Sequence, residues 1–99
     1  MITCRRTVTV PAKNLGAALA YGRESISYAK GKVGVDTKIE MPIGGNPWRM
    51  CFVMQFDSLA AFEQAMNKLN SDPKYMELAA KSSDIFVVGS AIDEVWASV

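Results

Sequence analysis

The stretch WRMCFVMQF, residues 48–56, decides the fold because two kinds of side chain alternate along it. One set is large and apolar: Trp48, Met50, Phe52, Met54 and Phe56. The set between them is half polar: Arg49, Cys51, Val53 and Gln55. A period of two is typical of a β-strand, and an apolar strand without proline inside it belongs in the middle of a sheet. We expect the large side chains to form the floor beneath a layer of helices.

The flanking segments predict an alternation of strands and helices. Strands are expected from β-branched or alternating residues over positions 3–10, 33–41, 48–56 and 84–99, the last with a bend or bulge near Gly89-Ser90. Helices are expected over positions 14–30, 59–69 and 74–81. Asp57-Ser58 offers a cap for the second helix, and Asp72 followed by Pro73 offers one for the third.

This order of elements, β-α-β-β-α-(α)-β, is the split βαβ or ferredoxin-like plan of the α+β class. Right-handed crossovers place the helices on one face of a four-stranded antiparallel sheet, with the first and third strands central. A length of 99 residues is right for one domain, so residues 1–99 are expected to form a single ferredoxin-like domain.

The charge balance and the apolar runs exclude several classes of protein. Eleven basic and ten acidic residues leave a net charge of +1, and no basic stripe indicates a nucleic-acid partner. No run approaches the 18 apolar residues of a membrane span or the apolar core of a signal peptide. Two cysteines, Cys4 and Cys51, do not form a disulfide framework. We therefore expect a soluble, cytoplasmic protein without a membrane or nucleic-acid partner.

The chain contains no histidine, so the commonest metal ligand and the commonest general base are missing. It also has no glycine-rich phosphate-binding motif. Asp36 and Glu40 share a face of the second predicted strand, but they would lie about 13 Å apart, too far to cooperate as a carboxylate pair. We expect neither a metal nor a cofactor, and the pattern identifies no catalytic residue.

The half-polar face of the central strand requires a different explanation from the floor. Its expected neighbours on the same face are Thr3, Arg5, Thr7, Thr9, Asp36, Lys38 and Glu40. Such a surface is too polar for a monomer core and too apolar for an ordinary solvated face, which suggests a partner. Two such sheets meeting about a two-fold axis would close a barrel, and this is the commonest type of oligomer symmetry.

The segment FVMQFDSLAAFEQAMNKL, followed by SDPKYMEL and a long final strand, resembles the dimeric α/β-barrel superfamily. The resemblance is to its NIPSNAP-like and antibiotic-biosynthesis-monooxygenase-like members, and it covers the second half of the chain and the first half in outline. It implies a homodimer with a cavity between each sheet and its helices or inside the shared barrel. Members include cofactor-independent oxygenases, isomerases, haem-degrading enzymes and proteins of no known activity. The absence of histidine argues against the haem-degrading and histidine-dependent activities.

Five residues of the half-polar face are candidates for ligand binding: Arg5, Lys38, Arg49, Cys51 and Gln55. The three cations could converge on an anionic ligand, because an arginine fork suits a carboxylate. The alternative is that Asp36 and Glu40 pair with them across strands. A lone cysteine such as Cys51 is more often a small buried hydrophobe than a nucleophile.

Three functions are compatible with this sequence. The leading hypothesis is a homodimer that binds a small organic molecule in a cleft beside the sheet, where Trp48, Trp96 and Tyr21 either stack on an aromatic ligand or pack in the core. The second is a cofactor-independent monooxygenase or isomerase acting on a small aromatic or anionic substrate. The third is a structural association module without a pocket.

Overall fold

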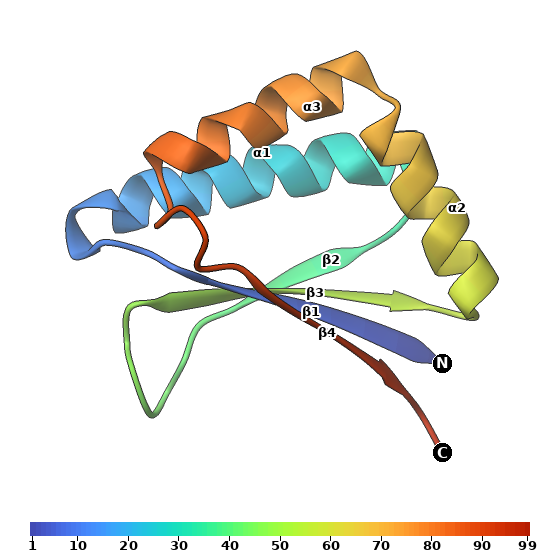
Figure 1. Ribbon diagram of the computed structural model, residues 1–99, viewed down its shortest axis with the longest axis horizontal. Helices are drawn as coiled ribbons and strands as arrows, with labels where there is room; N and C mark the ends of the chain where they lie inside the picture. Colours follow the sequence, from blue (N-terminus) through green and yellow to red (C-terminus); the bar gives the residue numbers. More distant parts are fainter.

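The computed structural model describes residues 1 to 99 as a four-stranded antiparallel sheet with its helices on one side (Figure 1). The strands are β1 (Ile2–Thr9), β2 (Thr37–Glu40), β3 (Arg49–Phe56) and β4 (Ile92–Ala97). The helices are α1 (Leu15–Val33), α2 (Leu59–Asn70) and α3 (Pro73–Ala80), with short 3-10 turns η1 (Ala12–Asn14) and η2 (Lys81–Asp84). None of these helices is long and apolar enough to cross a membrane.

The strand order β2-β3-β1-β4 confirms the ferredoxin-like α+β fold, with β1 and β3 in the centre. The register pairs Ile2 with Phe56 and Val8 with Met50. Since directly paired residues point to the same face, every even-numbered residue of these two strands faces the helices. The structure thus confirms that the large side chains from Met50 to Phe56 form the floor of the core.

The core consists of two small clusters on the helix face of the sheet. Val8, Val10, Ala18 and Met50 form one, and Ile2, Phe56 and Ala65 form the other. Trp48 was predicted to belong to this floor, and that prediction is wrong. Trp48 precedes β3 and is 49% exposed, because the loop turns there and its backbone N–H donates to Asn46 Oδ1 at 2.9 Å.

The second predicted strand is shorter than expected because α1 continues to Val33. Gly34 then ends the helix in the left-handed conformation with φ 72°, and its N–H bonds the Lys30 carbonyl. Asp36 consequently lies outside β2, and its carboxylate pairs with Lys30 Nζ at 3.0 Å instead of with a cross-strand partner.

The long final strand predicted over residues 84–99 is also wrong in its first half. Only Ile92–Ala97 are strand, whereas residues 85–91 cross over the core. Phe86 packs edge-on against Phe52, with ring centroids 6.3 Å apart, and the Val87 N–H bonds the Thr9 carbonyl at 3.0 Å. Gly89 turns the chain with φ 81°, at the position where a bend was expected. Core packing of Phe86 thus replaces strand pairing.

The predicted caps of the second and third helices are confirmed. Ser58 Oγ accepts the Ala61 N–H at 3.1 Å, and Asp72 Oδ1 accepts the Lys74 N–H at 3.0 Å. The Tyr28 hydroxyl also donates to Asp72, at 2.5 Å. Asp72 therefore both begins α3 and ties it to α1.

The helix layer covers the sheet unevenly. α1 approaches β2 and β3 so closely that a Cβ atom on Gly22 would lie 2.8 Å from Ile39 Cδ1 and 3.2 Å from Phe52 Cε1. At the opposite edge, all six residues of β4 are exposed. The uneven covering leaves β4 without a helix above it.

We predict that Gly22→Val destabilises the protein by about 1–3 kcal/mol more than Gly31→Val, because the extra methyl groups overpack the contact with β2 and β3. Gly31 is the matched control, since it lies in the same helix and a Cβ atom added to it would meet nothing within 4 Å. Urea denaturation measures both differences. Equal free energies of unfolding for the two variants would contradict the close approach.

Candidate functional site

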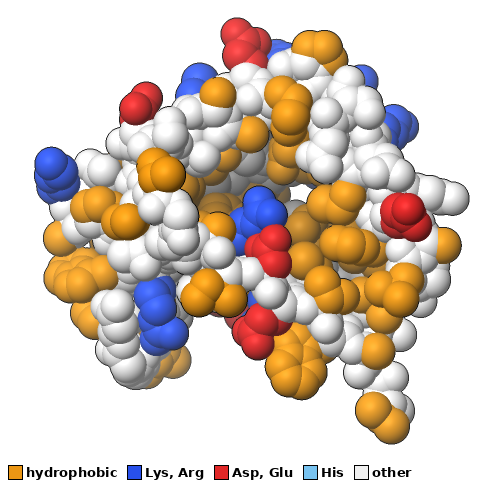
Figure 2. Space-filling model, in the orientation of Figure 1, with side chains coloured by type: hydrophobic (Ala, Val, Ile, Leu, Met, Phe, Trp, Pro, Cys, Tyr) orange, Lys and Arg blue, Asp and Glu red, His pale blue; other side chains and the backbone are white.

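A cavity of about 550 Å³ lies between the helix face of the sheet and the helix layer. Seventeen of its 25 lining residues are hydrophobic. Figure 2 looks into a hollow edged mostly by hydrophobic side chains, where a basic and an acidic side chain meet. Its size is within the range of about 300–1,000 Å³ typical of small-molecule sites, and so is its largely apolar lining.

Aromatic side chains form much of the wall of this cavity. They come from α1, β3, α2, α3 and residues 85–91, which we call the crossing segment. They are Tyr21, Phe52, Phe62, Tyr75 and Phe86. Phe86 is held edge-on between Tyr21, at 5.5 Å, and Phe52, at 6.3 Å. These contacts hold the rings in place, and they offer flat apolar surfaces to a planar ligand. Tyr21, a predicted core or stacking residue, lies in this wall.

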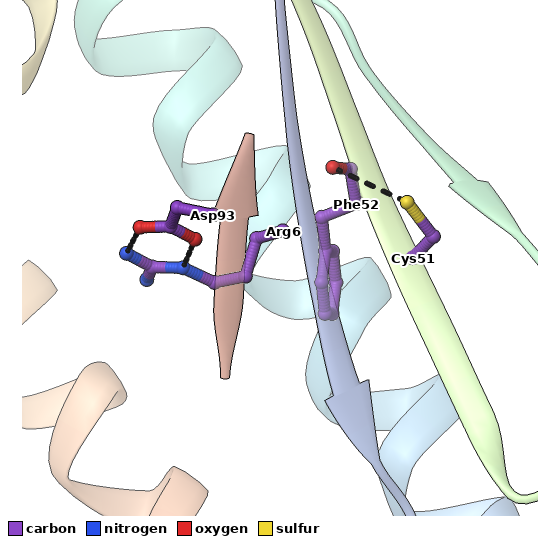
Figure 3. Close-up of polar contacts among 4 residues, drawn as sticks. All are labelled: Arg6, Cys51, Phe52 and Asp93. Atoms are coloured by element: carbon purple, nitrogen blue, oxygen red, sulfur yellow. Dashed lines mark hydrogen bonds and ion pairs between the residues drawn. The ribbon is translucent and has the colours of Figure 1, made fainter. Parts of the chain in front are cut away.

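Arg6 and Asp93 are the only charged residues that line the cavity. They face each other because β1 and β4 pair them directly in register. Arg6 Nε donates to Asp93 Oδ1 at 2.7 Å and Arg6 Nη2 donates to Oδ2 at 2.8 Å, which makes a bidentate ion pair (Figure 3). Their side chains are 57% and 48% exposed, so the pair lies at the mouth of the cavity.

The surroundings favour the charged forms of Arg6 and Asp93 and the neutral forms of Cys4 and Tyr75. The hydrogen bonds that Arg6 donates to Asp93 lower the pKa of the Asp93 carboxyl, and the same contact raises the pKa of Arg6. Burial raises the pKa of the Cys4 thiol, with a smaller contribution from the Asp93 carboxylate, and burial raises the pKa of Tyr75. Cys4 is therefore present as a thiol and Tyr75 as a phenol, and neither supplies an anionic nucleophile.

Ser25, on α1, supplies the one buried side-chain oxygen of the structure without a hydrogen-bond partner. The residue lines the cavity. A buried hydroxyl without a partner is costly, so a polar atom of a bound molecule would relieve that cost. Ser25 is thus a candidate hydrogen-bonding group for a ligand.

The five residues predicted to bind a ligand all lie on the opposite, open face of the sheet. Arg5 and Lys38 flank Val53 in register, and Arg49, Cys51 and Gln55 lie along β3. Figure 3 shows the Cys51 side chain and the Phe52 ring on opposite sides of β3, with the Cys51 thiol directed at the Phe52 carbonyl oxygen. The structure brings these residues onto one face, as predicted, but none of them lines the cavity.

Two of the three cations on the open face already have partners. Arg5 Nη1 pairs with Glu40 Oε1 at 2.6 Å, which is the cross-strand alternative weighed from the sequence. Arg49 donates to two carbonyls of its own loop, Asn46 O at 2.8 Å and Gly44 O at 3.2 Å. They do not converge on a common point in this chain.

Reasoning from the sequence missed Arg6, Asp93, Ser25 and Tyr75. One signal could have found Arg6, because it is a charged residue on the face of β1 that also carries Ile2, Cys4 and Val8. A charge at a position expected to be buried marks either an edge or a site. No comparable signal distinguishes the other three. No group of three histidine, cysteine, aspartate or glutamate side chains lies together to hold a metal ion.

The fold and cavity can be compared with proteins of known structure. A NIPSNAP domain protein from Burkholderia xenovorans superposes with a TM-score of 0.85 at 11% identity, over 100% of this chain and 95% of that one. A NIPSNAP family protein with unknown function from Agrobacterium tumefaciens gives 0.81 at 19% identity, over 100% and 88%. The chain has the ferredoxin-like α+β fold of these two proteins.

A candidate antibiotic biosynthesis monooxygenase from Deinococcus radiodurans shares the same fold, with a TM-score of 0.75 at 9% identity over 100% of this chain and 93% of that one. No protein-family model and no curated protein matches the sequence. At these identities the likeness concerns the fold, and the chemistry of the site depends on the residues described above.

We predict that the Asp93 carboxyl titrates below the ordinary aspartate pKa of about 3.9, and that Arg6→Met moves its midpoint back up toward that value. The ion pair is therefore present above the ordinary aspartate pKa, persists as the pH falls through that value, and is lost only as the pH falls through the lowered pKa of Asp93. Carboxyl carbon NMR measures the midpoint. Arg5→Met, on the other face and paired with Glu40, is the control and should leave it unchanged. An unmoved midpoint in Arg6→Met would contradict the pairing.

Proposed function

We propose that this protein is a homodimer that binds a small, largely apolar organic molecule in the cavity between the sheet and the helices. The observation that carries the proposal is the cavity itself, which has a volume of about 550 Å³ and 17 hydrophobic residues among 25. A closely packed interior normally leaves few voids larger than a water molecule. A space of this size, lined by aromatic rings and a few polar groups, suits a ligand rather than solvent.

The polar groups of the cavity are arranged to orient a ligand. The unpartnered hydroxyl of Ser25 comes from the helix side, and the guanidinium of Arg6 comes from the sheet at the mouth. Apolar walls supply the driving force for binding, and a small number of hydrogen-bonding groups supply orientation. A planar molecule carrying one or two polar atoms satisfies both requirements.

The dimer is supported by the apolar surface of the C-terminal part of the chain. Within residues 87–99, six large hydrophobic side chains are exposed: Val87, Val88, Ile92, Val95, Trp96 and Val99. Ile92 and Trp96 lie on the open face of the sheet, and Val95 lies on the other face of β4. Exposed apolar side chains on both faces of an edge strand favour an interface with another chain. The resemblance to the dimeric α/β-barrel superfamily implies that a second copy covers it.

In such a dimer the open face of the sheet becomes the inner wall of the barrel. Arg5, Lys38, Arg49, Cys51 and Gln55 are proposed to line the space between the two sheets. Lys38 makes no ion pair within the chain, and it would therefore be available to a carboxylate of the second copy or to an anionic ligand.

Binding is favoured over catalysis by the protonation states in the cavity. Cys4 and Tyr75 have raised pKa values, and the Asp93 carboxylate, whose pKa is lowered, is occupied by Arg6. A general base works best with a pKa near the working pH, and none of these three groups has one. The presence of the cavity likewise favours binding over a purely structural association module.

The binding proposal predicts that the neutral dye 1-anilinonaphthalene becomes fluorescent in the cavity and that Ala79→Trp weakens its binding about tenfold, since the indole occupies the space. Ala79 lines the cavity, whereas the neighbouring Ala80 is exposed and does not. Ala80→Trp is therefore the matched control, with a change below about twofold. Fluorescence titration gives both constants. Equal affinities for the two variants would overturn the assignment of the site.

The dimer proposal predicts that the protein sediments as a dimer at micromolar concentration and that Trp96→Asp weakens the dimer at least about tenfold, because each interface would bury two carboxylates. Leu59→Asp is the control, since Leu59 has the same 61% exposure as Trp96 but lies at the start of α2. Sedimentation velocity over a concentration series measures association. A monomeric wild-type protein would refute the dimer.

A further inference from the structure

We infer that Asp93 makes the cavity selective for neutral ligands over anionic ones, by neutralising Arg6 at the mouth. This inference rests on the proposed function, because it assigns the class of molecule that the same cavity takes. The charge balance of the cavity carries it. Among all lining residues there is one cation, Arg6, and one anion, Asp93, and they are paired with each other.

The geometry of the pair occupies one bidentate side of the Arg6 guanidinium and neutralises its charge. A guanidinium recognises a carboxylate or sulfonate best through two parallel N–H donors. Arg6 Nε and Nη2 form such a fork, and both already donate to the Asp93 oxygens, at 2.7 and 2.8 Å. The two N–H groups of Nη1 and the second N–H of Nη2 make no hydrogen bond within the chain. They can still donate to a neutral carbonyl or hydroxyl oxygen, but the guanidinium charge that an anion needs is already balanced by Asp93.

The other lining residues of the cavity supply no positive charge to balance a bound anion. An anion that leaves water for an apolar cavity loses its hydration, and that loss is costly unless a countercharge replaces it. The hydrophobic majority of the lining provides none, and the Asp93 carboxylate repels a second negative charge at the mouth. A neutral aromatic molecule avoids this desolvation penalty, and it gains contact with the aromatic rings.

The preference for neutral ligands depends on Asp93 alone, because no other charged residue lines the cavity beside the Arg6–Asp93 pair. If residue 93 carries no charge, the Arg6 guanidinium becomes an unpaired cation at the entrance to an aromatic cavity. That arrangement is suited to an aromatic carboxylate or sulfonate. Asp93 is therefore a specificity-determining residue whose removal should shift the preference of the site toward anionic ligands rather than abolish binding.

The test compares two dyes with the same ring skeleton, neutral 1-anilinonaphthalene and anionic 8-anilinonaphthalene-1-sulfonate. The wild-type protein should bind the neutral dye at least about tenfold more tightly than the sulfonate. Asp93→Asn should tighten the sulfonate at least about tenfold and raise the ratio of sulfonate affinity to neutral-dye affinity by a similar factor. The double variant Arg6→Gln with Asp93→Asn should lose the gain, because the gain needs the uncovered cation.

Two further measurements connect the gain to the cavity and to the folded protein. Ala79→Trp combined with Asp93→Asn should remove the tighter sulfonate binding, since the indole fills the space behind the pair. Asp93 is half exposed on an edge strand, so Asp93→Asn should keep the circular dichroism spectrum of the wild type, and Asp93→Ser replaces it if it does not.

The outcomes separate this inference from the proposed function. If neither dye binds to either the wild type or Asp93→Asn, the cavity is not the site and both proposals fail. Both proposals also fail if Ala79→Trp leaves the binding of the dyes unchanged. If the neutral dye binds in the cavity but the wild type binds the sulfonate equally well, only the inference fails. An unchanged ratio of the two affinities in Asp93→Asn overturns it as well.

Discussion

The antiparallel pairing of β1 with both β3 and β4 is the constraint on which the rest of the structure depends. Because side chains alternate strictly along a strand, this register places Ile2, Cys4, Arg6 and Val8 on the helix face together with their partners. A shift by one residue would exchange the two faces of β1. The core would then receive threonines, and Arg6 would leave Asp93. The floor of the core and the ion pair at the mouth of the cavity are thus set by one register.

The helix layer determines where the floor remains uncovered. α1 lies close to β2 and β3 at Gly22, and the crossing segment carries Phe86 over Phe52. No helix covers β4, so the charged pair between β1 and β4 stays half exposed beside an apolar cavity. An ion pair in that position costs little in desolvation, which allows a charge on an otherwise apolar face. The cavity, its mouth and the exposed edge of the sheet all result from the helix layer not extending over β4.

Both faces of the sheet are accounted for by the same alternation, but they serve different purposes. The helix face encloses the proposed ligand site, with Ser25 and the aromatic rings opposite the strands. The open face carries Arg5, Lys38, Arg49, Cys51 and Gln55 and is the proposed meeting surface of two copies. The sequence directed attention to the second of these faces for ligand binding, because its half-polar pattern is visible without coordinates. The cavity on the first face depends on the spacing between layers, which has no signature in a pattern of residues.

The alternation of residues 48–56, the helical spacing of apolar residues and the caps at Ser58 and Asp72 were sufficient to determine the order of elements, the central strands and the helix-covered face. These features are local, since each depends on the spacing of side chains along a few turns or pleats. The start of β2 is set by the left-handed Gly34 that ends α1, a local feature that the alternation of residues 33–41 obscured. The start of β4 was not determined locally, because Phe86 packs against Phe52, which is distant in the sequence. The Arg6–Asp93 pair joins residues 87 positions apart, and the cavity gathers side chains from nearly every element. Only the tertiary structure decided these, because they depend on which strands become neighbours and on how far the helices extend across them.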